Sequence, residues 1–279
     1  MRKRTGVPKG VGRAAIGVAA IRQRESQRPD RLFEDPYAAA FTAAAAGGFA
    51  DHDVVSGGPS ELAVVFADHA VIRTRFFDDY LVSAAEDGSR QVVLLAAGLD
   101  TRAFRLSWPE GTRLFELDRP DVLSFKQAVL DEQGAVPQCE RTALPADLCD
   151  PDWIAELVAA GFDRTTPTAW LIEGLLLYLT PEEAAALLAT VSEMSASTSH
   201  LALEHGAIAD TALMSAAEAD PAMHEDTILW KGGLAAGALN RLTHHGWDVQ
   251  THDRTQLAVS YRRSTPAHAT GGFITAIRR

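Results

Sequence analysis

The chain has few of the features that stabilise or anchor proteins outside the cytoplasm. Its 279 residues include only two cysteines, Cys139 and Cys149, too few for a disulfide framework or a four-thiolate zinc site. No segment approaches the ~18 uninterrupted apolar residues that a membrane-spanning helix needs. The Ala-rich stretch 14–21 is too short and too interrupted by glycine to serve as a signal peptide. We therefore expect a cytoplasmic protein with no metal and no membrane contact.

Positive charge is also scarce. Lys and Arg total 26 against 37 Asp and Glu, which gives a formal net charge of -11. Such a balance repels phosphate backbones, so we expect no nucleic-acid partner. One basic cluster stands out near the N-terminus: Arg2, Lys3, Arg4, Lys9 and Arg13. We interpret residues 1–23 as a basic, flexible tail. The oligomeric state stays open, with a homo-oligomer among the alternatives.

The residue pattern changes near position 88. Before it, two helices are expected, one beginning at Asp35-Pro36 and a long amphipathic one beginning after Ser60. After it, expected strands alternate with helices, and these strands are 92–96, 113–118, 138–144, 168–173, 200–204, 247–251 and 273–277. This alternation predicts an α/β fold with a twisted, mostly parallel sheet. We expect one domain over 24–279, with a helical cap over 24–88 and an α/β core over 89–279.

Several residues with chemical potential stand where these strands end, which is where open α/β sheets bind ligands. Gly98 allows close approach of the backbone, and Asp118, 20 residues later, stands where a ribose-binding carboxylate is expected. Asp147 and Leu148 could present an acid and an apolar wall to an adenine ring. Each also has a structural interpretation, as a turn or a helix cap. Glu173 ends an apolar strand, where an unpaired carboxylate would be costly.

The loop after the first expected strand does not fit a dinucleotide. Its sequence, Ala96-Ala97-Gly98-Leu99-Asp100, is not G-x-G-x-x-G, and the bulky Asp100-Thr101 pair follows where small residues should open a helix onto a pyrophosphate. A ligand with ribose and adenine but no phosphate fits better. S-adenosylmethionine (SAM) has that composition.

The motifs at 93–102, 114–120, 146–148 and 173–179 resemble the leucine carboxyl methyltransferase-like family. More closely, the chain resembles its actinobacterial O-methyltransferase branch, which includes polyketide carboxyl methyltransferases, from about residue 24 onward. The resemblance implies a class I, Rossmann-like SAM-dependent methyltransferase fold. It also implies a cofactor-binding set, with S-adenosyl-L-homocysteine (SAH) as product: Arg75 for the carboxylate of SAM, Gly98 for its amino-acid part, Asp118 for the ribose, Asp147 and Leu148 for the adenine, and Glu173 near the methionyl moiety. Ala97 and Asp100, on either side of Gly98, belong to the same cofactor-binding set. Family members often have glycine at position 96, where this chain has alanine.

We expect a SAM-dependent O-methyltransferase that acts on a carboxylate of a small or medium-sized metabolite, with natural-product (secondary) metabolism as the candidate setting. A carboxylate is ionised at neutral pH and needs no general base. A phenol, with a pKa of about 10, would need one. Candidate acceptor-side residues are Tyr178 and the histidines His69, His205, His224 and His268. Three alternatives stay open: a phenolic O-methyltransferase, a protein C-terminal carboxyl methyltransferase, and a SAM sensor without transferase activity.

Overall fold

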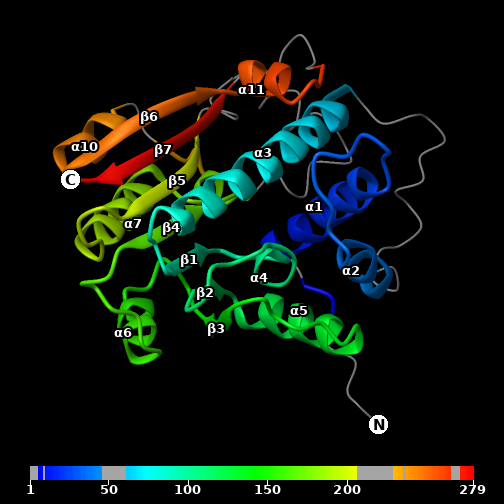
Figure 1. Ribbon diagram of the computed structural model, residues 1–279, viewed down its shortest axis with the longest axis horizontal. Helices are drawn as coiled ribbons and strands as arrows, with labels where there is room; N and C mark the ends of the chain where they lie inside the picture. The colour runs from blue at the N-terminus through cyan, green and yellow to red at the C-terminus, as the bar shows by residue number, and fades with distance from the viewer. Residues whose placement is uncertain (1–5, 9, 46–60, 206–228, 235–236, 265–270) are drawn as a thin grey trace.

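The sheet is the centre of the molecule. The computed structural model describes residues 6–8, 10–45, 61–205, 229–234, 237–264 and 271–279 (Figure 1). The strands are β1 (Gln91–Leu95), β2 (Arg113–Asp118), β3 (Glu140–Pro145), β4 (Thr168–Ile172), β5 (His200–His205), β6 (Trp247–Asp253) and β7 (Gly272–Arg278). They form one sheet in the order β3-β2-β1-β4-β5-β7-β6, in which β7 runs antiparallel to both of its neighbours. The predicted α/β class with a mostly parallel sheet is confirmed.

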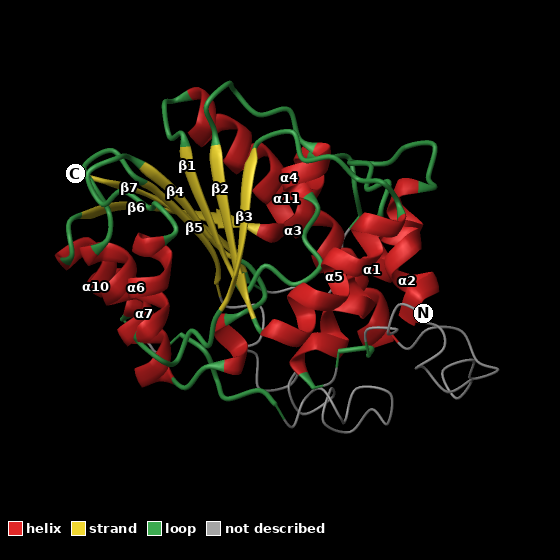
Figure 2. Ribbon diagram, turned by 90° about the horizontal axis from the view of Figure 1, so that it is seen from below, coloured by secondary structure: helices red, strands yellow, loops and turns green. Residues whose placement is uncertain are grey.

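Helices cover both faces of the sheet (Figure 2). One face carries α6 (Asp152–Ala159), α7 (Pro181–Glu193) and α10 (Ala238–His244). On the other side lie α1 (Val11–Ser26), α2 (Ala38–Ala45), α3 (Glu61–Glu86), α4 (Arg102–Arg105), α5 (Pro120–Glu132) and α11 (Arg254–Ser260). A short 3-10 turn, η2 (Leu176–Tyr178), follows β4. No described helix is long and apolar enough to cross a membrane.

Strand β1 is apolar without interruption because both of its faces are covered. All five of its residues are buried. Successive side chains of a strand point to opposite faces, so Val92 and Leu94 join the core beneath α3 and α5, whereas Val93 and Leu95 join the core beneath α6 and α7. The uninterrupted apolar pattern therefore indicates a strand that is covered on both faces.

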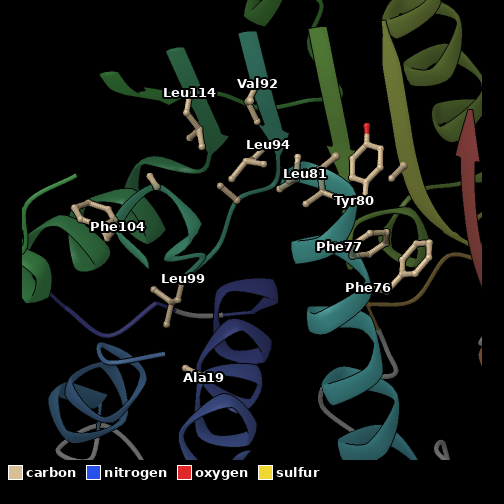
Figure 3. Close-up of a cluster of buried hydrophobic side chains, with 14 of the residues drawn as sticks. Ala19, Phe76, Phe77, Tyr80, Leu81, Val92, Leu94, Leu99, Phe104 and Leu114 are labelled. Atoms are coloured by element: carbon tan, nitrogen blue, oxygen red, sulfur yellow. The ribbon is translucent and has the colours of Figure 1, made fainter. Parts of the chain in front are cut away.

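Helix α3 is anchored to the centre of this sheet. Its residues Phe76 and Phe77 pack against Phe273 of β7, and Leu81 lies beside Leu94 of β1 (Figure 3). The buried Tyr80 hydroxyl also donates a hydrogen bond of 3.0 Å to the carbonyl of Trp170 in β4. The helix is thereby held in register with the strand ends, which sets the positions of the charged residues that it carries.

The prediction of a flexible tail over residues 1–23 is wrong from Val11 onward. Those residues begin helix α1, and Ile16 and Ala19 are buried in the core. Arg22 then donates to the carbonyl of Leu99 at 2.6 Å and to Asp35 at 2.8 Å. The basic residues suggested a solvated tail, but three-residue spacing of apolar side chains gives this helix a face to bury. The expected capping residue of α3, Ser60, lies outside the described residues.

Candidate active site

The ends of the parallel strands bring most of the predicted site residues to one edge of the sheet. Because parallel strands end at the same edge, the strand order places these residues in the spatial order Asp147, Asp118, Gly98 and Glu173, from β3 to β4. Glu204, near the end of β5, continues the row. Sequence reasoning identified all of these positions except Glu204.

The loop after β1 is folded tightly against Asp118. The backbone N–H of Gly98 donates to Oδ2 of Asp118 at 2.5 Å, and that of Ala97 donates to the carbonyl of Leu117 at 3.0 Å. Gly98 has a φ of 51° and Ala96 a φ of 58°. Left-handed backbone costs a non-glycine residue about 1–2 kcal/mol. This explains why glycine is the expected residue at position 96 and why the alanine there stores strain.

The carboxylate of Asp118 can accept further hydrogen bonds. Its Oδ1 accepts the N–H of Arg119 at 2.6 Å, and no cationic side chain among the described residues forms an ion pair with it. Burial raises the pKa of this carboxyl, while the N–H groups of Gly98 and Arg119 act in the opposite direction. A carboxylate held only by backbone donors has lone pairs left for hydroxyl donors of a ligand.

Arg102, the first residue of α4, joins three carboxylates. Its Nε donates to Asp78 at 2.6 Å and its Nη1 to Glu173 at 2.7 Å, and it also contacts Asp100. The arginine side chain is only 3% exposed. Burial alone would lower its pKa, but the charges of Asp100, Glu173 and Asp78 raise the pKa well above the usual value. Asp100 is therefore near the site but already paired.

Arg73 makes the corresponding link on the other side of Glu173. Its Nε donates to Glu173 at 2.9 Å and its Nη1 to Glu204 at 2.7 Å. The two glutamates follow the paired residues Ile172 and Leu203 of β4 and β5, so like charges lie side by side and need a cation between them. The side chain of Arg73 is 12% exposed.

Glu204 has all of its charge balanced by close partners. Besides Arg73, it accepts the N–H of Gly174 at 3.1 Å and lies 3.3 Å from Nε2 of His69. Burial alone would raise the pKa of Glu204, but Arg73 and His69 lower it to about 2. Burial lowers the pKa of His69, so its ring is neutral near pH 7.

Arg75 does not join this cluster. It pairs with Asp79 at 2.9 Å and with the carbonyl of Leu32 at 2.9 Å, and its side chain is 40% exposed. Two positions along a helix turn a side chain by roughly 200°, so Arg73 and Arg75 face opposite directions. A sequence signal was available: position 73 lies seven residues from both Phe66 and Tyr80, on the apolar face, and position 75 does not.

The remaining predicted residues are scattered. Asp147 is exposed and its Oδ1 accepts the N–H of Cys149 at 3.0 Å, while Leu148 packs against the core beneath α6 and α7. Tyr178 is partly buried in η2, and His205 is exposed at the end of β5. His224 and His268 lie outside the described residues. Among the described residues, no cluster of three or more His, Cys, Asp and Glu side chains could hold a metal ion.

Comparisons with known proteins show the family of this chain. The family model described as leucine carboxyl methyltransferase matches residues 15–192. A Frankia alni protein described as a "putative S-adenosyl-L-methionine-dependent methyltransferase" is 51% identical over 98% of this chain and 96% of its own length. A Streptomyces coelicolor protein of the same description is 43% identical over 98% of this chain and 97% of its own length.

Two solved structures share the fold. A DUF574 family protein of Streptomyces avermitilis has a TM-score of 0.59 and 18% identity, covering 94% of this chain and 97% of its own. Magnesium protoporphyrin IX methyltransferase of Synechocystis, solved with SAH, has a TM-score of 0.51 and 13% identity, covering 80% and 90%. The chain therefore belongs to the leucine carboxyl methyltransferase family of SAM-dependent methyltransferases, on a class I methyltransferase fold.

Proposed function

We propose that the protein transfers the methyl group of SAM to a carboxylate oxygen of a small or medium-sized metabolite. The observation that carries the proposal is the match of residues 15–192 to the carboxyl methyltransferase model, because this segment contains the whole row from Gly98 to Glu173. The row fits SAM laid along the sheet edge. Asp147 and Leu148 would flank the adenine, and Asp118 would accept the ribose hydroxyls.

The charges around Gly98 and Glu173 suit the amino-acid part of SAM, which carries both an ammonium and a carboxylate. Arg73 is the cation that we assign to the carboxylate in place of Arg75, because it contacts Glu173 directly. Glu173 and Asp100 supply negative charge for the ammonium. Gly98 has no side chain to obstruct the ligand, and a Cβ there would already meet Ala15 of α1 at 3.4 Å.

Positioning is the main requirement for this chemistry. SAM supplies a methyl group on a sulfonium, so the acceptor oxygen forms the new C–O bond as the C–S bond breaks and its electron pair stays on sulfur. Alignment of the reacting groups can contribute about 7–11 kcal/mol of barrier reduction. The rigid ion-paired row holds the donor in place for this step. A carboxylate acceptor is already ionised, so the protein needs no proton acceptor.

The test uses the chemical difference between methyl esters and aryl methyl ethers. Purified protein is mixed with methyl-labelled SAM and matched carboxylic acids and phenols, and the products are treated with alkali. We expect label transfer to an acid, and alkali should release it as volatile methanol. Alkali-stable label on a phenol would contradict the carboxylate proposal. Binding of SAM with no transfer to any member of the panel would instead favour a sensor.

A phenolic or other hydroxyl acceptor is the second candidate, and His69 favours it. Its Nε2 lies against the ionised Glu204, which leaves the buried Nδ1 with no hydrogen-bond partner. A neutral imidazole held in this way could accept the proton of a hydroxyl group. If this candidate is correct, His69→Gln abolishes methylation of a phenol while SAM still binds. If the acceptor is a carboxylate, the same substitution leaves the pH profile flat between pH 6 and 9.

A further inference from the structure

A group of polar side chains beyond β4 has unfilled hydrogen-bonding capacity. Within the part of the chain that the structure describes, four buried atoms of this group have no hydrogen-bond partner: Oδ2 of Asp68, Nδ1 of His69, and both Nε and Nη2 of Arg254. The whole Arg254 residue is 2% exposed. An unsatisfied buried donor or acceptor costs about 1–3 kcal/mol, and more when it is charged. Such a group is expected where a ligand completes the hydrogen bonds.

The group lies at the same edge of the sheet as the proposed cofactor site. Arg254 directly follows β6, whose last residue, Asp253, pairs with Gly272 of β7. Gly272 in turn pairs with His205 at the end of β5. From α3, His69 contacts Glu204, and its ring stacks on Phe273 at 5.7 Å between centroids. The group is therefore reached by passing along the edge from β4 across β5.

This position is on the acceptor side of the site. If Asp118 holds the ribose at β2 and Glu173 lies beside the methionyl part at β4, the donor extends along the edge toward β5. A methyl acceptor would then approach from the ends of β5 and β6. Arg73 is already assigned to the carboxylate of SAM, and Arg102 directs its donors to Glu173 and other acids, so neither arginine is left for a second anion.

Arg254 has a suitable shape for a carboxylate. Its Nε and Nη2 form one edge of the planar guanidinium, and their parallel N–H bonds match the two oxygens of a carboxylate. Among the described residues, Arg254 forms an ion pair with Asp68, whose Oδ2 lies 3.9 Å from Nη2, which is too long for a hydrogen bond. Each oxygen of a carboxylate bound at this edge uses one lone pair and retains another for attack on a methyl group.

We propose that Arg254 is a specificity-determining residue that binds the carboxylate of the methyl acceptor through its Nε and Nη2 edge. This inference rests on the proposed function and assigns the acceptor to the ends of β5 and β6. Acceptors that carry a carboxylate are selected over their neutral amides, because only the anion satisfies both donors of the buried guanidinium.

The first test measures stability without any ligand. If Arg254 is a structural partner of Asp68, Arg254→Met leaves the partly buried Asp68 without its cation, and the Tm falls by several degrees. If Arg254 awaits a ligand, the same change removes an unsatisfied buried cation, and the Tm stays unchanged or rises. A lower Tm would overturn the proposal. The matched control is Arg241→Gln on the exposed surface of α10, which leaves the Tm unchanged.

The second test measures binding to the SAH complex by calorimetry. The probes are straight-chain carboxylates from hexanoate to dodecanoate and their primary amides. We expect at least one carboxylate to bind the wild type at least tenfold more tightly than its amide, and Arg254→Gln to remove this preference. Equal binding of acid and amide, or no carboxylate binding, overturns the proposal.

Two controls separate this proposal from the broader one. SAH affinity is measured in the same titrations, and we expect it to be the same in Arg254→Gln, Arg241→Gln and the wild type. If the wild type binds SAH normally but does not prefer carboxylates to amides, only the proposed role of Arg254 is disproved. Failure of the wild type to bind SAH removes the proposed function and, with it, this inference.

Discussion

Asp118 and Glu204 are acids near the ends of β2 and β5, and they share no hydrogen-bond or ion-pair partner. Asp118 accepts two backbone N–H groups, and burial raises its pKa. Glu204 is surrounded by Arg73, His69 and the N–H of Gly174, and its pKa falls to about 2. Of these two acids, the one whose charge is not already balanced has hydrogen-bonding capacity left for the hydroxyl groups of a ligand. Asp118 meets this condition and Glu204 does not.

The two halves of the site also differ in what holds them. The β1–β2 half depends on backbone hydrogen bonds within a short loop, whereas the β4–β5 half depends on arginines from α3 and α4 that reach several acids at once. We therefore expect substitutions in the first half to affect mainly ligand binding. Substitutions in the second half should also affect folding.

The largest effect is expected at Arg102. Arg102→Met leaves Asp78, Asp100 and Glu173 without their shared cation, and breaking a buried ion pair costs about 3–5 kcal/mol. Arg75→Met removes only a half-exposed pair and should change stability by less than about 1 kcal/mol. Urea unfolding of both variants measures the difference. Similar losses in the two variants would show that the ion pairs of Arg102 do not hold the β4–β5 half together.

The next effect separates Arg73 from Arg75 in binding the cofactor. Hydrogen bonds to charged groups contribute about 1.5–3 kcal/mol, so Arg73→Gln should weaken SAM binding by roughly 10- to 150-fold. Arg75→Gln, on the opposite face of the same helix, should leave the affinity unchanged. Calorimetry on both folded variants checks this. A loss confined to Arg75→Gln would restore the assignment made from sequence.

At the other end of the row, Asp118→Ala should weaken SAM binding about tenfold, which corresponds to about 1.4 kcal/mol. The reason is loss of an acceptor for the ribose hydroxyls. Asp121→Ala, which alters a partly exposed acid in the first turn of α5, is the matched control. Equal affinity in wild type and Asp118→Ala would show that the carboxylate only holds the Gly98 loop.

The smallest effect concerns acid stability. The folded-state pKa of Glu204 is about 2, below its usual value of 4.5. Its contribution to stability is therefore fully present above pH ~4.5 and is lost as the pH falls toward 2. Only the start of this loss falls between pH 5 and 3.5, where urea unfolding should show a weaker pH dependence for Glu204→Gln than for the wild type. Asp118→Ala should not reduce the dependence, because the pKa of Asp118 is shifted upward.

Local patterns were sufficient for the first half of the site. The apolar run of β1, the glycine that follows it and the acid at the end of β2 lie within one βαβ unit, so their spacing carries the geometry. The helix α1 was misjudged because its charged residues were weighed above its apolar spacing. The sequence pointed to Arg75 because a motif names residues without stating which face of the helix they share, whereas the structure places Arg73 against Glu173.

The sequence by itself determined the α/β class, the strand ends at which we propose that the cofactor binds, and the loop around Gly98, because each depends on periodicity or on neighbours close in the chain. Tertiary structure alone decided which arginine meets Glu173, how Glu204 is neutralised, and that Arg254 comes to the same edge as Asp68 and His69. Those contacts join residues more than 90 positions apart. Such pairings arise from the packing of α3 across β4 and β5 and from the strand order, and no local pattern specifies either.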